Sequence, residues 1–471
     1  MKIFHISAEC YPIAKVGGLA DVVGALPKYQ NNLGAISSVV MPFYDNAFTQ
    51  KNNFKSIYEG KLDFNGHKIS YNILKTKAAI LDFEVYFVDI PNLLYKNYVY
   101  SQDDTDRFLA FQIATLDWIL TLKDFPEIIH CHDHHTGLIP FMCQESFKYK
   151  SLNTIPVITT IHNAQYQGWF GYDKLHLIPE FESTKTGLLD WDHCINPLAA
   201  AIKCAWRVTT VSPSYMDELK QEANGLQDLL QHESNKCIGI LNGIDTAVWN
   251  PETDHYIAHN YNIKTLEAGK LANKLALCKT FNLDETKPLI TFIGRLVHEK
   301  GADVFPLAIK KALEDENCSV LVLGSGNDES EQALLQLKEN NTGLYNVFIG
   351  YDEKLSHNIY AGADYLLMPS RVEPCGLNQL YALRYGTIPV VRSIGGLKDT
   401  VIDIDKNEGF GISHQEVTVE QIYKAITRSI DLYIKTTIFK SIRKHIMTID
   451  HSWDVSAKAY INLYQSLKKQ L

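Results

Sequence analysis

Residues 289–294 read Leu289-Ile290-Thr291-Phe292-Ile293-Gly294, an apolar run that is too short for a helix and ends at a glycine. Such a run is typical of a strand buried on both faces of a parallel sheet. Further apolar runs follow at 319–323, 346–350, 365–368 and 388–391, and helix-like segments separate them. This alternation predicts a doubly wound α/β domain in the second half of the chain.

The first half of the chain shows the same alternation, with apolar runs at 2–8, 37–42, 85–90, 127–132, 156–162 and 207–212. Between the halves, residues 243–287 are polar and irregular, so we expect them to connect two domains. The sequence therefore predicts an α/β protein with two Rossmann-like doubly wound domains facing a cleft, at 1–245 and 246–452. Residues 453–471 carry apolar side chains at helical spacing and predict a final helix that packs against one of the halves.

The composition excludes some classes of function. Of 471 residues, 46% are hydrophobic and 21% are charged, as in globular proteins. Lysine and arginine total 45 against 54 acidic residues, for a net charge of −9. Because no domain-wide basic field exists, we expect no nucleic-acid partner. Any bound anion must be held by a local cluster of positive groups.

Nine cysteines are scattered along the chain without a Cys-x-x-Cys pair, a pattern that indicates reduced thiols. Glu9 interrupts the apolar run at the N-terminus before a signal-peptide core could form. No stretch approaches the roughly 18 uncharged apolar residues of a membrane span. We therefore expect a cytoplasmic protein with no membrane partner.

Ligands of open α/β sheets bind beyond the carboxyl ends of the strands, so motifs that follow strands are the candidate site residues. After the first strand, Lys15 precedes Gly17 and Gly18, where an amphipathic helix begins. The glycines allow close approach of a ligand, the helix start presents N–H groups and Lys15 adds a positive charge, so phosphate could bind here. The alternative is an ordinary turn with a solvated lysine.

In the second half, Arg295 and Lys300 follow the strand at 289–294. Arginine supplies a planar fork of donors and lysine a mobile point charge, a pair suited to holding a departing diphosphate. An ion pair between one of them and Glu299 on the surface is the alternative.

Glu373 lies between the strand at 365–368 and a helix that extends to about Tyr385. Gly376 permits close approach of a ligand, and the amides of Gly376 and Leu377 lie at the predicted helix start. Glu373 could stabilise a cationic transition state or hold sugar hydroxyls. Structurally, it could instead cap the helix or pair with Arg371.

Residues 130–135 read His130-Cys131-His132-Asp133-His134-His135 and suggest a zinc site. However, strand alternation separates Cys131 from its two histidine neighbours, and no helical histidine pair completes a ligand set. We therefore expect no metal and no other cofactor. Asp133 and a histidine are better suited to binding a polyol at the strand end. His162 lies at the end of the next strand, where a buried structural histidine is the alternative.

Together these motifs resemble the bacterial glycogen synthase and starch synthase family, whose members are retaining glucosyltransferases of the two-Rossmann-domain (GT-B) type. The resemblance spans nearly the whole chain and rests on Lys15-Val16-Gly17-Gly18-Leu19-Ala20-Asp21, His132-Asp133, Thr160-Ile161-His162-Asn163, Leu241-Asn242-Gly243-Ile244-Asp245, Gly294-Arg295-Leu296 with Lys300-Gly301, and residues 371–380. It implies that residues 453–471 cross back to the first domain.

The resemblance also implies the reaction and the residues that perform it. The reaction is transfer of glucose from ADP-glucose to the non-reducing end of an α-1,4-glucan such as glycogen, with retention of configuration and without a metal. The implied catalytic residues are Glu373, Arg295, Lys300 and His162. The implied substrate-binding residues are Lys15, Gly17, Gly18, Asp21, Asp133, Asn242, Tyr351, Cys375, Gly376 and Leu377, with Tyr351 stacking on the nucleotide base.

Some positions depart from the family pattern. His134 stands where tryptophan is usual, Gly395 follows Ile394 where threonine is usual, and the segment around Tyr95 lacks the customary arginine and glycine. A catalytically silent binding protein on the same fold and a phosphorylase with a pyridoxal-binding lysine are the competing hypotheses. Composition and spacing do not separate ADP-glucose from UDP-glucose, whereas the family resemblance favours ADP-glucose.

Overall fold

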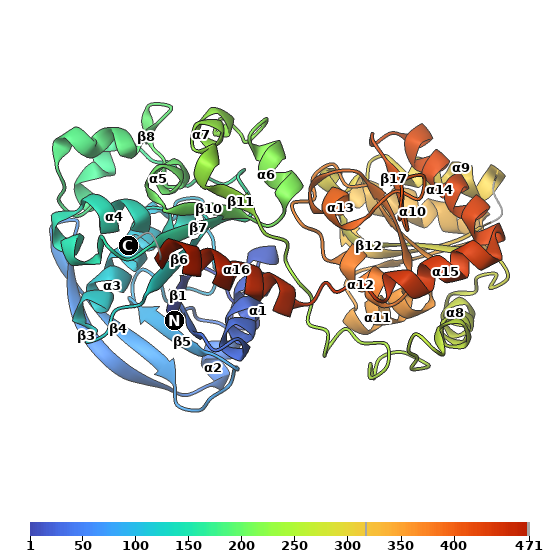
Figure 1. The fold of residues 1–471 in the computed structure, drawn as a ribbon, viewed down its shortest axis with the longest axis horizontal. Coiled ribbons are helices and arrows are strands. Elements are labelled where there is room, and N and C mark those ends of the chain that lie inside the picture. Colours follow the sequence, from blue (N-terminus) through green and yellow to red (C-terminus); the bar gives the residue numbers. More distant parts are fainter. Residues whose placement is uncertain (316–317, 469–471) are drawn as a thin grey trace. The chain divides into compact units, whose positions relative to one another are not determined.

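A computed structural model of the chain describes residues 1–315 and 318–468. The chain forms two compact units (Figure 1). Unit 1 comprises Met1–Asn242 and Trp453–Leu471, and unit 2 comprises Gly243–Ser452. Across the described ranges, no helix combines the length and apolar character needed to cross a membrane.

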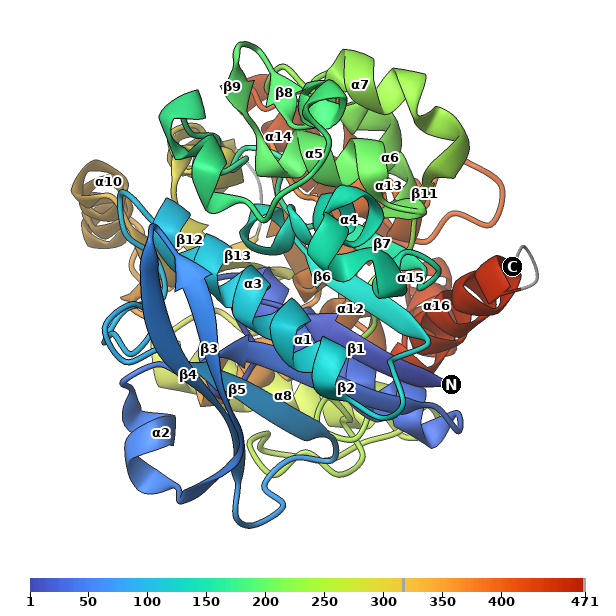
Figure 2. The same cartoon turned by 90° about the vertical axis from the view of Figure 1, so that its left-hand side faces the viewer.

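Unit 1 is built on one mixed sheet. Its strand order is β11 (Cys237–Gly239), β10 (Arg207–Thr210), β7 (Val157–Ile161), β6 (Ile128–His132), β1 (Lys2–Ile6), β2 (Ile36–Pro42), β5 (Glu84–Asp89), β4 (His67–Thr76) and β3 (Phe54–Phe64). The strands from β11 to β5 run parallel, as predicted for the six from β10 to β5, whereas the short edge strand β11 was not predicted. By contrast, β4 and β3 form an antiparallel hairpin at the edge that the sequence analysis did not predict (Figure 2). Most residues in the first part of β3 are exposed, so it lacks the continuous apolar run of a buried strand.

Helices cover the sheet of unit 1, and the last helix packs beside the first. They are α1 (Gly18–Asn32), α2 (Ala47–Lys51), α3 (Thr105–Thr121), α4 (Ile139–Glu145), α5 (Pro197–Cys204), α6 (Pro213–Leu219), α7 (Gln227–His232) and α16 (Trp453–Lys468). Trp453, Ala457 and Tyr460 of α16 share a core with Val22 and Leu26 of α1. The helix predicted at 453–471 is therefore part of unit 1, although 469–471 lie outside the described residues. A short ribbon of β8 (Asp190–Trp191) and β9 (Cys194–Ile195) completes the unit.

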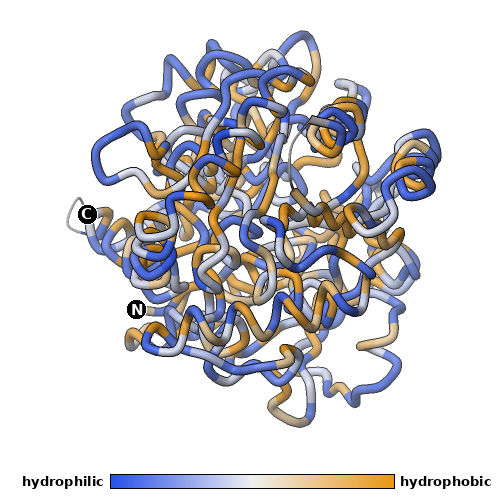
Figure 3. The backbone as a smooth tube through the Cα atoms, turned by 90° about the vertical axis from the view of Figure 1, so that its right-hand side faces the viewer, coloured by the Kyte–Doolittle hydropathy of each residue, from blue (hydrophilic) through white to orange (hydrophobic). Residues whose placement is uncertain are grey.

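Unit 2 contains a parallel sheet with the strand order β14 (Tyr345–Ile349), β13 (Ser319–Gly326), β12 (Leu289–Leu296), β15 (Tyr365–Met368), β16 (Ile388–Arg392) and β17 (Ile412–His414). Its helices are α8 (Leu266–Phe281), α9 (Phe305–Asp315), α10 (Asp328–Asn340), α11 (Glu353–Gly362), α12 (Asn378–Arg384), α13 (Gly395–Thr400), α14 (Val419–Ile434) and α15 (Thr436–Ile446). Hydrophobic and hydrophilic residues alternate along the helices, as Figure 3 shows. The sequence-based expectation of two doubly wound α/β domains is confirmed.

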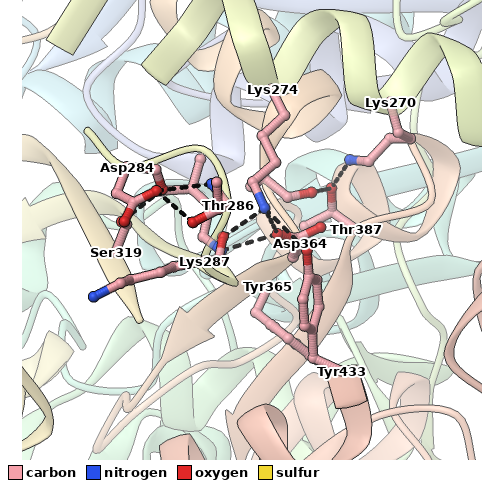
Figure 4. A network of polar contacts seen from close by, with 12 residues as sticks. Lys270, Lys274, Asp284, Thr286, Lys287, Ser319, Asp364, Tyr365, Thr387 and Tyr433 are labelled. Carbon is pink, nitrogen blue, oxygen red and sulfur yellow. Dashed lines mark hydrogen bonds and ion pairs between the residues drawn. The ribbon is translucent and has the colours of Figure 1, made fainter. Parts of the chain in front are cut away.

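Helix α8 corrects one prediction, because it lies within the segment 243–287 that was expected to be irregular. Its inward face carries Lys270, Asn273 and Lys274, all at most 4% exposed. Lys274 Nζ lies 2.7 Å from the Asp364 carboxylate, and Lys270 Nζ donates to Thr387 Oγ1 at 2.6 Å (Figure 4). Burial lowers the pKa of Lys270 well below its ordinary value. Hydropathy does not reveal a helix that packs through polar partners distant in sequence.

The order of the strands locates a ligand-binding edge in each unit. In unit 1 the chain adds β2 and β5 on one side of β1, and then β6, β7 and β10 on the other. In unit 2 it adds β13 and β14 beside β12, and then β15 and β16 on the other side. Ligands of such sheets bind at the carboxyl ends of the strands where the order reverses. The loops after β1 and β6, and after β12 and β15, are therefore the candidate sites.

Candidate active site

The loop after β1 closes around a buried carboxylate that the sequence analysis overlooked. Glu9 is 3% exposed, and its Oε2 accepts hydrogen bonds from the amides of Val16 at 2.5 Å and Gly17 at 3.0 Å. The Tyr100 hydroxyl donates to Glu9 Oε1 at 2.5 Å. The Gly17 amide, expected to face phosphate, is thus bound to Glu9, and this favours the alternative of a structural turn at that residue. In the described part of the chain, the Gly18 amide at the start of α1 has no hydrogen-bond partner.

Lys15 and Asp21 form an ion pair in this loop. Lys15 Nζ lies 2.7 Å from Asp21 Oδ1 and 2.8 Å from Oδ2, and the lysine side chain is 47% exposed. An exposed pair of this kind contributes at most about 1 kcal/mol. Lys15 can therefore exchange Asp21 for another anion at little cost. In the free chain Asp21 acts as the partner of Lys15.

After β6, Asp133 has a strained backbone with φ 56° and ψ −176°. This region is normally reserved for glycine, and such strain clusters at functional sites. Asp133 Oδ1 accepts a hydrogen bond from the His162 amide at 2.7 Å, which joins the ends of β6 and β7. Burial raises the pKa of Asp133 to about 7. The second sugar-binding candidate, Asn242, has a buried Oδ1 without a hydrogen-bond partner in the described ranges.

Histidines fill the interior beneath these loops. Ring nitrogens of His5, His130 and His132 lie within 4.8 Å of one another. However, both ring nitrogens of each of these residues already lie within 3.0 Å of a polar partner. Cys131 is part of the apolar core of the unit. Metal binding at these histidines would have to break hydrogen bonds inside a closed core. His162 Nε2 lies 3.0 Å from His132 Nδ1.

In unit 2, Arg295 lies within β12 rather than after it, because the strand extends to Leu296. Its side chain is 70% exposed, with Nη2 3.4 Å from Glu299 Oε2. The ion pair with Glu299 considered above as an alternative is thus present in the free chain. An exposed pair at this distance is readily exchanged. Tyr351, the predicted base-stacking residue, follows β14 and is also highly exposed.

Lys300 and Glu373 form the central pair of the unit 2 site. Lys300 Nζ lies 2.6 Å from Glu373 Oε2, and Ser370 Oγ donates to the same oxygen at 2.8 Å. The Glu373 side chain is 10% exposed. Arg371, which the sequence offered as a partner for Glu373, binds Asp303 through two hydrogen bonds instead. The loops after β12 and β15 therefore bring a cation and a carboxylate together.

Backbone contacts hold these two loops in place. The Arg371 amide donates to Glu299 O at 2.7 Å, and its Nη1 donates to His298 O at 2.7 Å. Gly301 has φ 77°, and a Cβ there would lie 2.7 Å from Pro369 O. Only glycine fits this turn, which places Lys300 beside the loop that carries Glu373.

The glycine pair Gly395 and Gly396 packs against the backbone of Glu373 and Cys375, a role that the sequence analysis missed because it noted Gly395 only as a departure from the family pattern. The Gly396 amide donates to Glu373 O at 3.1 Å. A Cβ on Gly395 would lie 2.1 Å from Glu373 O, and one on Gly396 would lie 2.0 Å from Cys375 O. From Glu373 itself the chain passes Gly376, at φ 71°, and enters α12 through Leu377. A glycine pair after a strand was the signal for this close approach.

Two doubly wound α/β units with charged loops after their strands form the architecture of the two-domain glycosyltransferases of the GT-B class. Family models agree: a starch synthase catalytic domain matches residues 2–232, and glycosyl transferases group 1 matches residues 276–441. A glycogen synthase from Flavobacterium johnsoniae is 52% identical over the full length of both chains. One from Streptococcus agalactiae is 36% identical, covering 99% of this chain and 100% of the relative. The chain belongs to the glycogen synthase and starch synthase family.

Solved structures support this assignment. The catalytic domain of starch synthase IV from Arabidopsis thaliana, bound to ADP and acarbose, matches with a TM-score of 0.87 and 32% identity over 99% of each chain. A sucrose-phosphate synthase from Thermosynechococcus elongatus matches with a TM-score of 0.64 and 16% identity over 100% of this chain and 99% of that one. At this identity the second match shows the fold alone.

Proposed function

We propose that the chain transfers glucose from ADP-glucose to the non-reducing end of an α-1,4-glucan with retention of configuration and without a metal. The observation that carries the proposal is the Lys300–Glu373 pair, which joins the loops after β12 and β15 at the carboxyl ends of the strands. The 52% identity to a glycogen synthase supports the acceptor class. ADP in the Arabidopsis starch synthase IV structure supports the donor.

Stabilising the leaving group is the main catalytic task, because negative charge develops on the departing diphosphate. Lys15, Arg295 and Lys300 supply the compensating positive charge that a metal supplies elsewhere. In the free chain each of these cations is bound to a carboxylate. Phosphate oxygens then replace the carboxylates as partners, and no bound metal is needed for this exchange.

Glu373 acts at the reaction centre. Once Lys300 turns to the diphosphate, the Glu373 carboxylate faces the sugar, where positive charge develops at the anomeric carbon. Asp133 and Asn242 bind sugar hydroxyls through oxygens with free acceptor capacity. Tyr351 stacks on the base. His162 contacts the sugar from the end of β7.

Configuration is retained when the diphosphate leaves from, and the acceptor hydroxyl attacks, the same face of the sugar. The bond from the anomeric carbon to the diphosphate oxygen breaks, and the acceptor 4-oxygen forms the new bond. The acceptor proton passes to an oxygen of the departing diphosphate. Overall, one glucosyl group passes from the diphosphate to the acceptor, and one proton passes from the acceptor to the diphosphate. No covalent enzyme intermediate is required.

A donor-specificity assay tests the proposal. ADP-[14C]glucose and UDP-[14C]glucose are each incubated with glycogen primer, and label in precipitated glucan is counted. We expect incorporation from ADP-glucose and release of the label by β-amylase, which cleaves α-1,4 linkages from the non-reducing end. Incorporation of label from UDP-glucose but not from ADP-glucose would reject ADP-glucose as the donor. No incorporation would favour the silent binding protein, and phosphate-dependent breakdown with pyridoxal absorbance would favour a phosphorylase.

A further inference from the structure

A row of buried side chains connects helix α1 to the candidate active site within unit 1. Gln30 Oε1 lies 2.8 Å from His5 Nε2, and His5 Nδ1 lies 3.0 Å from His132 Nε2. His132 Nδ1 in turn lies 3.0 Å from His162 Nε2. Gln30 and His5 are 0% exposed and His132 is 1% exposed, whereas His162 is partly exposed. In the described part of the chain, His162 Nδ1 has no hydrogen-bond partner and is the free end of the row.

The amide oxygen of Gln30 sets the direction of every bond in this row. The Ser37 hydroxyl also donates to Gln30 Oε1, at 2.6 Å. A carbonyl oxygen can only accept, so His5 carries its proton on Nε2. Burial lowers the pKa of His5 to about 4 and of His162 to about 3, and it lowers that of His132 well below its ordinary value. Each ring is therefore neutral and carries one proton.

In a row of neutral imidazoles each ring donates once and accepts once. Since His5 Nε2 donates to Gln30, its Nδ1 accepts from His132 Nε2–H. His132 Nδ1 is then bare and accepts from His162 Nε2–H. His162 Nδ1 therefore carries no proton and presents a lone pair at the end of β7.

A second branch contacts the amide nitrogen of Gln30. Its Nε2 donates to the Tyr464 hydroxyl of α16 at 3.4 Å. The Tyr464 hydroxyl lies 2.6 Å from His130 Nδ1, and His130 Nε2 lies 2.6 Å from Thr160 Oγ1. The amide is thus bound at both ends, and the C-terminal helix supplies one of its partners.

We propose that Gln30, His5 and His132 are positioning residues that hold His162 in its Nε2–H tautomer, so that Nδ1 accepts a hydrogen bond from a donor-sugar hydroxyl. His162 then orients the sugar as an acceptor and cannot protonate a leaving group. The proposal rests on the proposed function only for the identity of the sugar, because the tautomer is a property of the free chain.

The tautomer can be measured directly in the free, full-length protein. Histidine rings are labelled with 15N, and a long-range 1H–15N correlation spectrum distinguishes a bare ring nitrogen from a protonated one. The His162→Gln variant identifies the His162 signals by their loss. We expect a bare Nδ1 and a protonated Nε2 on His162. A protonated Nδ1 would overturn the proposal, whether or not any variant folds.

A pair of variants tests the origin of the tautomer. Gln30→Met keeps the length of the side chain but removes the acceptor, so we expect the His162 signals to move toward a mixture of tautomers. Thr209→Val is the matched control, because Thr209 Oγ1 lies 2.6 Å from Thr160 on the other branch and is equally buried. It should leave the His162 signals unchanged. An unchanged His162 spectrum in folded Gln30→Met would reject the role of Gln30.

Kinetics supply a second readout. If half of the Gln30→Met molecules hold the wrong tautomer, the apparent affinity for the donor falls about two-fold. We expect KM for ADP-glucose to rise by about that factor while kcat changes less, and Thr209→Val to match the wild type. A changed kcat with an unchanged KM would contradict a role in orienting the sugar. Absence of transferase activity with the expected tautomer would reject the proposed function and leave the row of histidines standing.

Discussion

Removing the Lys300 ammonium should cost catalysis far more than stability. In the free chain Lys300 binds Glu373 at 2.6 Å, and under the proposed function it binds the departing diphosphate in the transition state. Losing one such preorganised group lowers kcat by about 10²–10³, equivalent to about 3–4 kcal/mol. We therefore expect Lys300→Met to lower kcat by this factor.

The structure offers a matched control in Lys274, which pairs with Asp364 at 2.7 Å in the same unit. Both of those side chains are 5% exposed, compared with 22% for Lys300. Removing one partner of a buried pair destabilises the fold by about 3–5 kcal/mol, which lowers the melting temperature of a domain of this size by roughly 10 °C. Lys274→Met should therefore melt earlier than Lys300→Met and retain wild-type kcat per folded molecule.

The assay combines initial rates of label incorporation with circular dichroism at a temperature below both melting transitions. Rates are divided by the folded fraction, so that lost stability is not counted as lost catalysis. The reasoning would be refuted by wild-type kcat in Lys300→Met. It would also be refuted if folded Lys274→Met lost kcat to the same extent.

Three further predictions concern metal and pH. Turnover should be unaffected by excess EDTA, and loss of activity that zinc restores would show that the buried histidines bind a metal. Burial raises the pKa of Asp133 to about 7, so kcat/KM should fall below that pH as the carboxylate is protonated, and Asp133→Asn should flatten the pH–rate profile. Burial lowers the pKa of His5 from 6.5 to about 4, so protons bind the unfolded chain preferentially below pH 6.5. The free energy of unfolding should therefore fall as the pH drops toward 4, by about 3 kcal/mol for His5 alone. Calorimetry from pH 7 to 4 measures this change, and a melting temperature that stays constant over the range would contradict the prediction.

The sequence was informative wherever burial left an apolar pattern. Most central strands of both units contain short apolar runs, so their positions and order along the chain could be anticipated, whereas the short edge strands β11 and β17 were not predicted. Helix α8 was not predicted because its buried face carries Lys270 and Lys274. The partner of Lys274 is the Asp364 carboxylate, 90 residues away in the sequence. The β3–β4 hairpin was not predicted because β3 is the edge strand of the sheet and only two residues of each strand are buried, so neither strand has a continuous apolar run.

In the candidate site, too, local sequence motifs could be predicted, whereas contacts between residues far apart in the chain could not. Motif position after a strand was sufficient to select Lys300 and Glu373 separately. Their pairing joins residues 73 positions apart, and no local pattern encodes it. Likewise, the sequence placed glycines in the loop after β1, but it did not show that the Glu9 carboxylate accepts a hydrogen bond from the Gly17 amide.

These pairings change how anion binding must be understood in a chain with a net charge of −9. The predicted phosphate-binding cations are not bare: Lys15 binds Asp21, and Arg295 binds Glu299. Opening these two exposed pairs costs at most about 1 kcal/mol each. The Lys300–Glu373 pair is more buried, so its opening is the costly step of the exchange. Under the proposed function, only a ligand that offers a diphosphate to Lys300 and sugar hydroxyls to Glu373 satisfies both partners at once, and a free phosphate satisfies only one. The pair therefore favours the nucleotide sugar over simple anions.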